Sequence, residues 1–190
     1  MTERQKFELV RRYESFELRR YEPCVVAEVE ISGDYQSAAS GAFRHLFNYI
    51  SKGNSSSTSI DMTAPVIATT DAQLDSQKWK ISFVMPAGSK LEDMPLPTNE
   101  KVTLLEIGSQ ECVSISFKGK ATEQLAKKYE DRLRQLAEGE GIALSEERRI
   151  GRFDPPFKPG FMQYNEIVIP CVNQGEREPH ARTEAESRVI

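Results

Sequence analysis

Residues 33–53 read GDYQSAASGAFRHLFNYISKG, and residues 119–139 read GKATEQLAKKYEDRLRQLAEG. An offset of 86 residues aligns the glycines at both ends of the two stretches. It also aligns the apolar positions Ala39, Phe43, Phe47 and Ile50 with Leu125, Tyr129, Leu133 and Leu136. These positions recur at the three- and four-residue spacing of an amphipathic helix. The two stretches therefore predict two duplicated helices, whose shared stripe faces a sheet.

Short strands are predicted around each helix. The segments with β-branched or alternating apolar residues are 15–31, 60–69, 80–86, 101–107 and 112–117. A strand opened by a cysteine, Cys24 or Cys112, precedes each helix, and FVMP (83–86) matches IVIP (167–170) at an offset of 84. Pro65 places its strand at a sheet edge or a bulge, because proline cannot donate to a ladder. Residues 101–107 and 112–117 are predicted to pair as a hairpin.

The repeat predicts the fold class and the domain organisation. We expect an α+β fold in which pseudo-two-fold duplicated β-α-β-β units form a distorted antiparallel β-barrel flanked by two helices. The domain is expected to span residues 1–172, with halves at about 13–93 and 101–172. Residues 173–190 are polar and charged, so we expect a disordered C-terminal tail, in which His180 is solvated.

Composition narrows the class of function. Hydrophobic residues make up 38% of the 190 residues and charged residues 28%, with a net charge of −4. This balance gives no electrostatic argument for a nucleic-acid partner. No apolar run approaches the ~20 residues of a membrane-spanning helix, so we expect no integral membrane protein. Three scattered cysteines indicate reduced thiols in a cytoplasmic compartment.

The first helix carries a second apolar row. Its members are Tyr35, Ala38, Ala42, Leu46 and Tyr49, and their counterparts at the same offset are Ala121, Gln124, Lys128, Arg132 and Gln135. This excess apolar face indicates a ligand groove, a dimer contact or burial under a loop, and weak self-association stays open. His45 lies at the edge of the row, pointing toward solvent or a groove rim. We do not expect it to ligate a metal.

No standard catalytic or metal-binding motif is present. The sequence contains no H-E-x-x-H, C-x-x-C, G-x-S-x-G or P-loop pattern. The cysteines and the helical histidine lack the spacing of zinc ligands. The residues alone therefore predict a duplicated α+β domain with a candidate apolar groove.

Five segments, in order, resemble the SOUL or haem-binding protein family. They are YESFELRRYEPCVVAEVEISG (13–33), AFRHLFNYISKGN (42–54), IDMTAPV (60–66), FVMP (83–86) and FDPPFKP with QYNEIVIP (153–170). The resemblance covers roughly residues 13–172. It implies a two-fold pseudosymmetric β-barrel that binds haem b or another tetrapyrrole non-covalently. It also implies a cytoplasmic protein, or a plastid one if the source is photosynthetic.

The resemblance also implies a set of binding residues. A porphyrin is a flat apolar disc with carboxylates at its edge, so it needs an apolar groove and cationic groups at the rim. The implied contacts are Ser40, Phe43, Arg44 and Phe47 of the first helix and Phe153, Phe157 and Lys158 of the later loop. Some relatives have arginine where this chain has Ser40, and Arg44 is the expected substitute. Lys158 is the expected partner of a propionate, whereas Met62 and Pro65 are expected to be structural.

The axial ligand of an iron atom is not evident. One branch of the family has a proposed haem-ligating histidine at the position of Arg20, and an arginine is a poor iron ligand. We therefore expect binding mainly through apolar contacts, with tolerance of metal-free porphyrins.

Two other classes of function remain. The duplicated unit is similar to gyrase-inhibitor-like domains, some of which bind or hydrolyse small molecules with an acidic residue and a tyrosine. Glu166 and Tyr164 are the candidate pair for such a hydrolase. Alternatively, the chain is a protein-interaction module that uses the apolar face of its first helix. We favour the binding protein over the enzyme.

Overall fold

The computed structural model of the chain describes residues 2–71 and 78–172. The strands in these residues are β1 (Phe7–Arg12), β2 (Glu17–Tyr21), β3 (Cys24–Ser32), β4 (Val66–Asp71), β5 (Lys78–Val84), β6 (Thr103–Ile107), β7 (Gln110–Lys118), β8 (Glu147–Arg152) and β9 (Tyr164–Pro170). The α-helices are α1 (Tyr35–Ile50) and α2 (Glu123–Gly139), and the short 3-10 helices are η1 (Leu91–Asp93) and η2 (Gly160–Met162). The predicted tail, with His180, lies outside the described residues.

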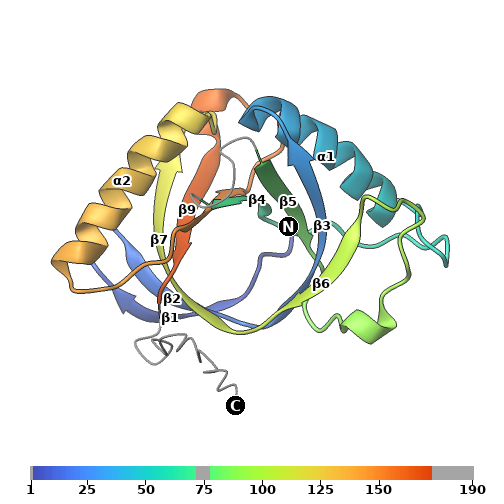
Figure 1. The fold of residues 1–190 in the computed structure, drawn as a ribbon, viewed down its shortest axis with the longest axis horizontal. Helices are drawn as coiled ribbons and strands as arrows, with labels where there is room; N and C mark the ends of the chain where they lie inside the picture. Colours follow the sequence, from blue (N-terminus) through green and yellow to red (C-terminus); the bar gives the residue numbers. More distant parts are fainter. Residues whose placement is uncertain (1, 72–77, 173–190) are drawn as a thin grey trace, which may run out of the picture.

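All these strands belong to one sheet. Its order is β1-β2-β7-β9-β8-β4-β5-β3-β6, and every pairing between neighbours is antiparallel. The order is symmetric about the β8–β4 junction, because β9, β7 and β2 on one side mirror β5, β3 and β6 on the other. The sheet curls into a half-barrel, and both helices lie on its outer face (Figure 1). The predicted α+β class and its pseudo-two-fold arrangement are confirmed.

The predicted hairpin at 101–107 and 112–117 is wrong. β6 pairs with β3, whereas β7 pairs with β2 and β9. In Figure 1 the chain runs from β6 into β7 without turning back, so the two strands belong to opposite halves of the sheet. β2 and β6 are thus exchanged between the halves. The strand pattern identifies each strand but carries no information on its partner.

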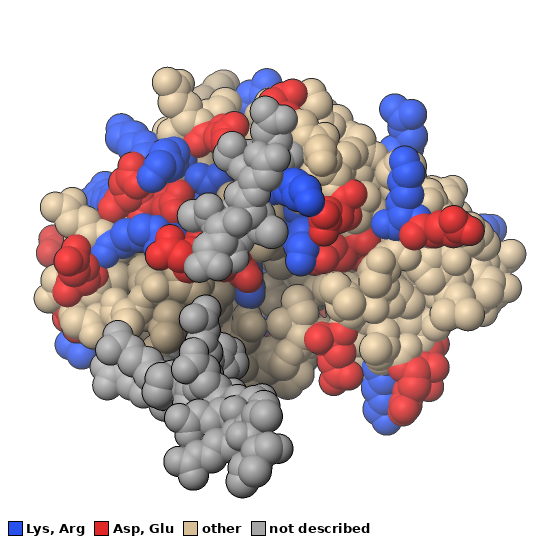
Figure 2. All heavy atoms as spheres, in the orientation of Figure 1, with Lys and Arg blue, Asp and Glu red and all other residues tan. Residues whose placement is uncertain are grey.

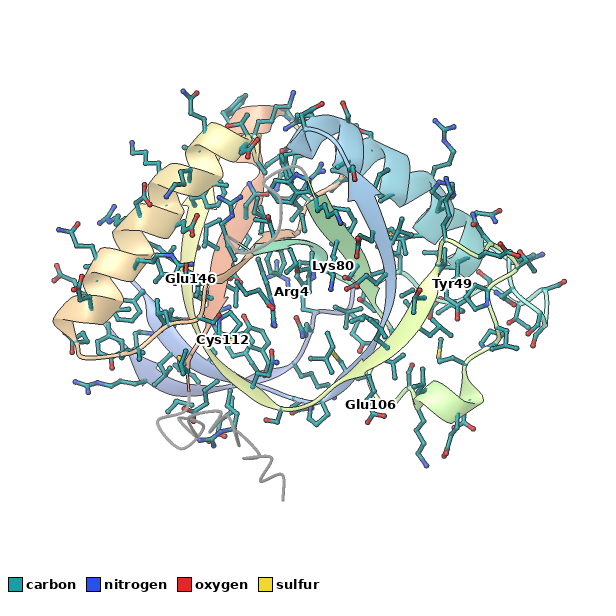
Figure 3. The ribbon with its side chains drawn as sticks, viewed as in Figure 1. Arg4, Tyr49, Lys80, Glu106, Cys112 and Glu146 are labelled. Carbon is teal, nitrogen blue, oxygen red and sulfur yellow. The ribbon has the colours of Figure 1, made fainter. Side chains whose placement is uncertain are left out.

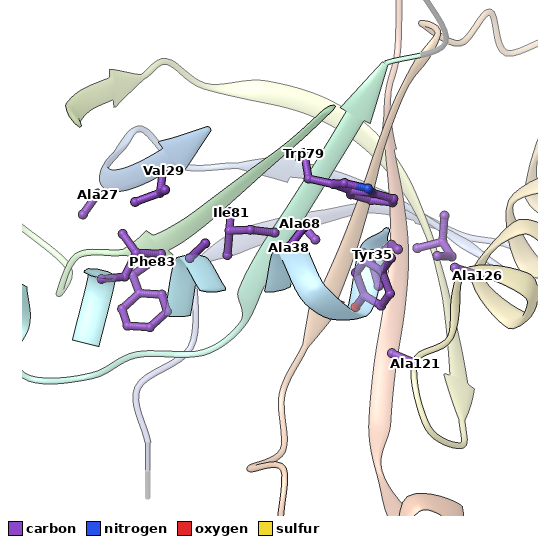
Figure 4. Packing of buried hydrophobic residues seen from close by; sticks show 14 of the residues in the cluster. Ala27, Val29, Tyr35, Ala38, Ala68, Trp79, Ile81, Phe83, Ala121 and Ala126 are labelled. Atoms are coloured by element: carbon purple, nitrogen blue, oxygen red, sulfur yellow. The ribbon is translucent and has the colours of Figure 1, made fainter. Parts of the chain in front are cut away.

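Side-chain alternation along the strands separates an outer face from an inner one. On β9, Ile167 and Ile169 join the main hydrophobic core beneath the helices, whereas Glu166 and Val168 line the interior of the half-barrel. Figure 4 shows Ile81 and Phe83 of β5 in the outer core. α1 packs on β3 and β5, and α2 packs on β7 and β9, which repeats the pseudosymmetry of the sheet.

Helix α1 buries a different face from the predicted one. Phe47 is 48% exposed and Phe43 is only half-buried, so the predicted stripe does not form the main contact with the sheet. The buried residues are Tyr35, Ala38, Ala42, Leu46, Tyr49 and Ile50. The row that the sequence analysis treated as surplus is therefore the core row, and the surplus apolar surface lies at Phe43 and Phe47.

The two helices begin at different distances from the glycine that precedes each of them, and this difference explains the misassigned face. Gly33 and Gly119 both adopt left-handed backbone angles, with φ of 135° and 129°, which favour glycine. The N-cap Asp34 follows Gly33 directly, whereas the N-cap Thr122 lies three residues after Gly119. A single offset of 86 therefore misaligns the helix faces, because each residue rotates a helix by ~100°.

Three strand assignments also differ from the prediction. β4 starts after Pro65 and lies between β8 and β5, so it is neither an edge strand nor bulged at the proline. β1 and β8 were not predicted. Every residue of β1 is exposed, and four of the six residues of β8 (ERRIGR) are charged, so neither strand has a plain apolar pattern.

The surface is mixed in charge. Lysine and arginine are interleaved with aspartate and glutamate on the face in Figure 2. Among the described residues, no helix is long and apolar enough to cross a membrane.

Candidate functional site

An apolar groove of about 540 Å³ lies on the outer face of the sheet, between α1 and the loop after β8. The volume falls within the range of about 300–1,000 Å³ that is usual for small-molecule sites. Its lining residues are Thr2, Tyr35, Ala39, Ser40, Phe43, Met62, Thr63, Ala64, Val66, Ala68, Ile81, Arg152, Phe153, Asp154, Pro155, Pro156 and Phe157. Five separate parts of the chain, at residues 2, 35–43, 62–68, 81 and 152–157, therefore meet around one apolar space.

Four of the predicted binding residues line this groove together. Ser40 and Phe43 come from α1, and Phe153 and Phe157 come from the loop. The other three, Arg44, Phe47 and Lys158, are not among the lining residues. A ligand contact by any of the seven stays a prediction.

Ion pairing within the loop explains the position of Lys158. Its Nζ lies 2.8 Å from Asp154 Oδ1, and this hydrogen bond holds the pKa of Asp154 below its usual value. The backbone N–H of Tyr164 donates to Asp154 Oδ2 at 2.7 Å, and Gln163 Nε2 donates to the Lys158 carbonyl at 2.9 Å. The loop is thus tied to β9, and the ammonium group predicted for a propionate already has a carboxylate partner.

Aromatic packing positions the side of the groove that α1 forms. The Phe43 ring stacks on Phe47 at 5.8 Å and meets Phe83 of β5 edge-on at 5.4 Å. Phe47 therefore extends the apolar surface along α1 beyond the groove. Arg44 is exposed on the same helix.

Arg152 is a groove residue that was not predicted, whereas Tyr35 was predicted only as part of the second apolar row of the first helix. The Tyr35 hydroxyl is buried without a well-aligned hydrogen bond to any described residue, the Arg152 guanidinium lies near enough to lower its pKa, and the Tyr35 ring lies 5.0 Å from that of Trp79 (Figure 4). Arg152 is half-buried at the end of β8. The available signal was the alternation in ERRIGR (147–152), which places Arg148, Ile150 and Arg152 on one face of a strand.

The residues considered as iron ligands lie elsewhere. His45 Nδ1 is 2.8 Å from Asn99 Nδ2, an amide donor, so this contact ties α1 to the connector before β6. Arg20 on β2 pairs with Glu8 at 3.1 Å and Glu111 at 2.6 Å. Neither residue lines the groove. Within the described residues, no three His, Cys, Asp or Glu side chains cluster closely enough to hold a metal.

The interior of the half-barrel holds a separate charged network around a smaller cavity of about 140 Å³. Arg19 donates to both carboxylate oxygens of Glu166, at 2.8 and 3.1 Å, and the Tyr164 hydroxyl donates to Glu166 Oε1 at 2.6 Å. Burial and the hydrogen bond to Glu166 raise the pKa of Tyr164 to about 12. Figure 3 labels Arg4 in this interior, and its guanidinium lies 5.0 Å from the Phe153 ring. The candidate hydrolase pair is thus brought together, but its carboxylate is bound by an arginine.

The sequence matches the model of the SOUL heme-binding protein family over residues 2–170. The chain belongs to this family. It is also 25% identical over 156 residues to Heme-binding protein 1 from Xenopus tropicalis, which covers 80% of this chain and 82% of the relative. The family assignment made from the five segments is therefore confirmed.

Solved structures share the fold at low sequence identity. The C-terminal domain of EcmrR has a TM-score of 0.66 at 14% identity, covering 83% of this chain and 96% of that one. A hydrolase from Listeria innocua has a TM-score of 0.57 at 16% identity, covering 86% and 94%. These likenesses concern the fold alone.

Proposed function

We propose that the chain binds haem or a related tetrapyrrole in the groove between α1 and the 153–157 loop. The observation that carries the proposal is a groove of about 540 Å³, lined mainly by apolar side chains, in a member of the SOUL family. Phe43 on one wall and the Pro155-Pro156-Phe157 run on the other present flat apolar surfaces to a planar ring. Such surfaces match the faces of a macrocycle.

The residues that line the groove are better suited to contact a porphyrin ring than to ligate its iron atom. No histidine or cysteine lines the groove, and Met62 offers the single thioether among its lining residues. Haem, when bound, supplies an iron atom and two carboxylates besides its apolar ring. We expect the groove to hold the ring mainly by apolar burial, so metal-free protoporphyrin IX should bind within about 10-fold of haemin.

Two exposed phenylalanines provide a matched test. Phe157 is 88% exposed and lines the groove, whereas Phe161 is 78% exposed and does not. Because neither is part of the core, serine at either position should leave stability nearly unchanged. Titration with haemin and protoporphyrin IX, followed by absorption and by Trp79 fluorescence, should show roughly 5- to 20-fold weaker binding to Phe157→Ser. Phe161→Ser should match the wild type.

A third variant, His45→Ala, tests whether His45 ligates the haem iron. An unchanged Soret maximum in His45→Ala is expected, because His45 contacts Asn99 and not the groove. Equal weakening by Phe157→Ser and Phe161→Ser would show that the ring binds elsewhere. Binding of haemin with no binding of the metal-free ring would overturn the apolar-groove proposal. Buffering, transport and delivery of the tetrapyrrole are all consistent with such a site.

The hydrolase alternative has weaker support from the geometry. Glu166 accepts hydrogen bonds from Arg19 and Tyr164 on both of its oxygens, so it is poorly placed to take a proton from a substrate. Turnover of an apolar ester that Glu166→Gln abolishes would nevertheless establish an enzyme. The alternative that the chain is a protein-interaction module rests on the exposed ring of Phe47. Light scattering of the purified chain at micromolar concentration tests whether the chain self-associates.

A further inference from the structure

Two arginines, Arg148 and Arg152, lie four residues apart on the outer face of β8, and they differ in their interaction partners. Alternation places Arg148, Ile150 and Arg152 toward the helices, whereas Arg149 and Gly151 line the interior cavity. Arg148 Nη1 donates to Glu130 of α2 at 2.9 Å, and its guanidinium lies 5.5 Å from the Trp79 ring. Arg148 is therefore a paired, structural cation.

Arg152 has no comparable partner. Its side chain forms no ion pair with any residue that the structure describes, although it is half-buried and lines the groove close enough to the Tyr35 hydroxyl to lower the pKa of that phenol. The one acidic residue in the groove lining is Asp154. Both oxygens of Asp154 are engaged, Oδ1 with Lys158 Nζ at 2.8 Å and Oδ2 with the Tyr164 N–H at 2.7 Å. The free protein thus presents an uncompensated positive charge to an otherwise apolar space.

The Tyr35 hydroxyl is a second polar group without a partner in the same groove. Tyr35 is 1% exposed, and its oxygen makes no hydrogen bond within the described chain. Burial raises the pKa of Tyr35, and the nearby Arg152 guanidinium is the largest of the groups that offset this rise. The phenol is therefore a neutral donor at physiological pH, close to the unpaired guanidinium.

A half-buried guanidinium without a carboxylate partner, next to a buried phenol whose O–H has no acceptor among the described residues, favours a ligand that accepts from both. A buried hydrogen-bonding group left unsatisfied is costly, as is a charge removed from water without a counterion. A carboxylate suits both donors, because the guanidinium fork can bind two oxygens and the phenol can bind one of them. Phosphate-sized groups suit the walls less well, since most of the lining side chains are apolar.

We propose that Arg152 and Tyr35 form a carboxylate subsite in the groove. This inference rests on the proposed function, and it specifies the ligand as an apolar ring that carries an acidic substituent. The acidic edge enters first and meets Arg152, while the rest of the ring lies between Phe43 and the Pro155-Pro156-Phe157 run. The subsite replaces the propionate contacts that the sequence suggested for Arg44 and Lys158.

The test compares a tetrapyrrole acid with its ester. Protoporphyrin IX and its dimethyl ester share one ring, but the ester has no negative charge. The wild type should bind the acid roughly 10- to 100-fold more tightly, the size of effect expected for a charge-assisted contact. Arg152→Gln should reduce this preference to within about 3-fold by weakening the acid alone. Arg152→Lys should keep part of the preference, and Tyr35→Phe should reduce it less than Arg152→Gln.

Arg44→Gln is the matched control, since it removes a cation that does not line the groove, and it should keep the wild-type preference. Circular dichroism checks that Arg152→Gln folds, as expected because Arg152 forms no ion pair with any described residue. Equal affinity of the wild type for acid and ester would refute the subsite, as would equal loss of both ligands in Arg152→Gln. Those results would leave the groove intact as a ring site.

Failure of the proposed function has a different signature. If the wild type binds neither ring, the tetrapyrrole proposal is overturned. The subsite is then judged with 1-anilinonaphthalene-8-sulfonate, an apolar anion whose fluorescence rises on binding. Weaker binding of this probe to Arg152→Gln than to the wild type and to Arg44→Gln would support the anion subsite. Unchanged binding across the three proteins would refute it.

Discussion

Replacing Arg19 with methionine tests how the charged interior of the half-barrel is stabilised. Arg19 and Glu166 are 7% and 4% exposed, and two hydrogen bonds of 2.8 and 3.1 Å join them. Without Arg19, the Glu166 carboxylate keeps one side-chain partner, the Tyr164 hydroxyl at 2.6 Å. Removing one partner of a buried pair costs about 3–5 kcal/mol, because the remaining charge is uncompensated. We expect Arg19→Met to lose free energy of unfolding in this range.

Two further variants separate the ion pair from general disruption. In Glu166→Gln, Arg19 still has Glu17 at 2.8 Å, so the expected loss is smaller, about 1–3 kcal/mol. The double variant Arg19→Met/Glu166→Leu removes both charges and supplies apolar volume. Its loss should be well below the sum of the single losses, since an apolar replacement of a buried pair is often neutral.

Urea unfolding, followed by circular dichroism and by the fluorescence of the single tryptophan, Trp79, provides the measurement. For a denaturant slope near 2 kcal/mol/M, the Arg19→Met midpoint should fall by about 2 M. A midpoint shift below about 0.5 M at an unchanged slope would refute the assigned burial of the pair. Additive losses in the double variant would refute the coupling between Arg19 and Glu166.

Three shorter predictions follow from the core. Leu46→Ala should cost about 2–5 kcal/mol and Phe47→Ala less than about 1 kcal/mol in urea unfolding, because Leu46 is buried and Phe47 is 48% exposed; the reverse order would restore the originally predicted helix face. Burial raises the pKa of Tyr21 to about 12, above its ordinary value of 10, so the folded state holds this proton more tightly. The stability from this shift, about 2–3 kcal/mol, should be complete below pH 10 and lost between pH 10 and about 12, and Tyr21→Phe should flatten that part of the profile. Burial also raises the pKa of Cys112 to about 12, so this thiol should not react in the native protein at pH 8. Cys112→Ser should therefore leave the number of thiols labelled in the native protein unchanged. After unfolding, the number of labelled thiols should fall from three to two.

Much of the local structure was predictable from the sequence. The 3.6-residue periodicity identified both helices, and the alternating segments identified most of the strands, because these signals depend on near neighbours in the chain. β1 and β8 were missed because their residues are exposed or charged. The family was also recognisable from short segments such as MTAPV and FDPPFKP. Four of the seven predicted binding residues line one groove, as their positions in those segments suggested.

Long-range packing decided the rest. The β6–β7 hairpin failed because β6 pairs with β3 across the sheet, and no local pattern encodes that choice. The buried face of α1 was misassigned because its cap lies closer to the preceding glycine than that of α2, so a single offset does not align the faces of the two helices. The pairing of Lys158 with Asp154 cannot be inferred from a sequence spacing alone, and a ligand contact by Lys158 stays a prediction.

The sequence by itself determined a duplicated α+β fold, a SOUL family member and an excess of apolar surface on the first helix. Only the tertiary structure decided where that surface lies and which polar groups it surrounds. Tyr35 and Arg152 are 117 positions apart, in elements of different type, and each looks ordinary in its own segment. They become a candidate carboxylate subsite because the fold brings both to one groove and, among the described residues, places no carboxylate in an ion pair with Arg152, which only three-dimensional surroundings can decide.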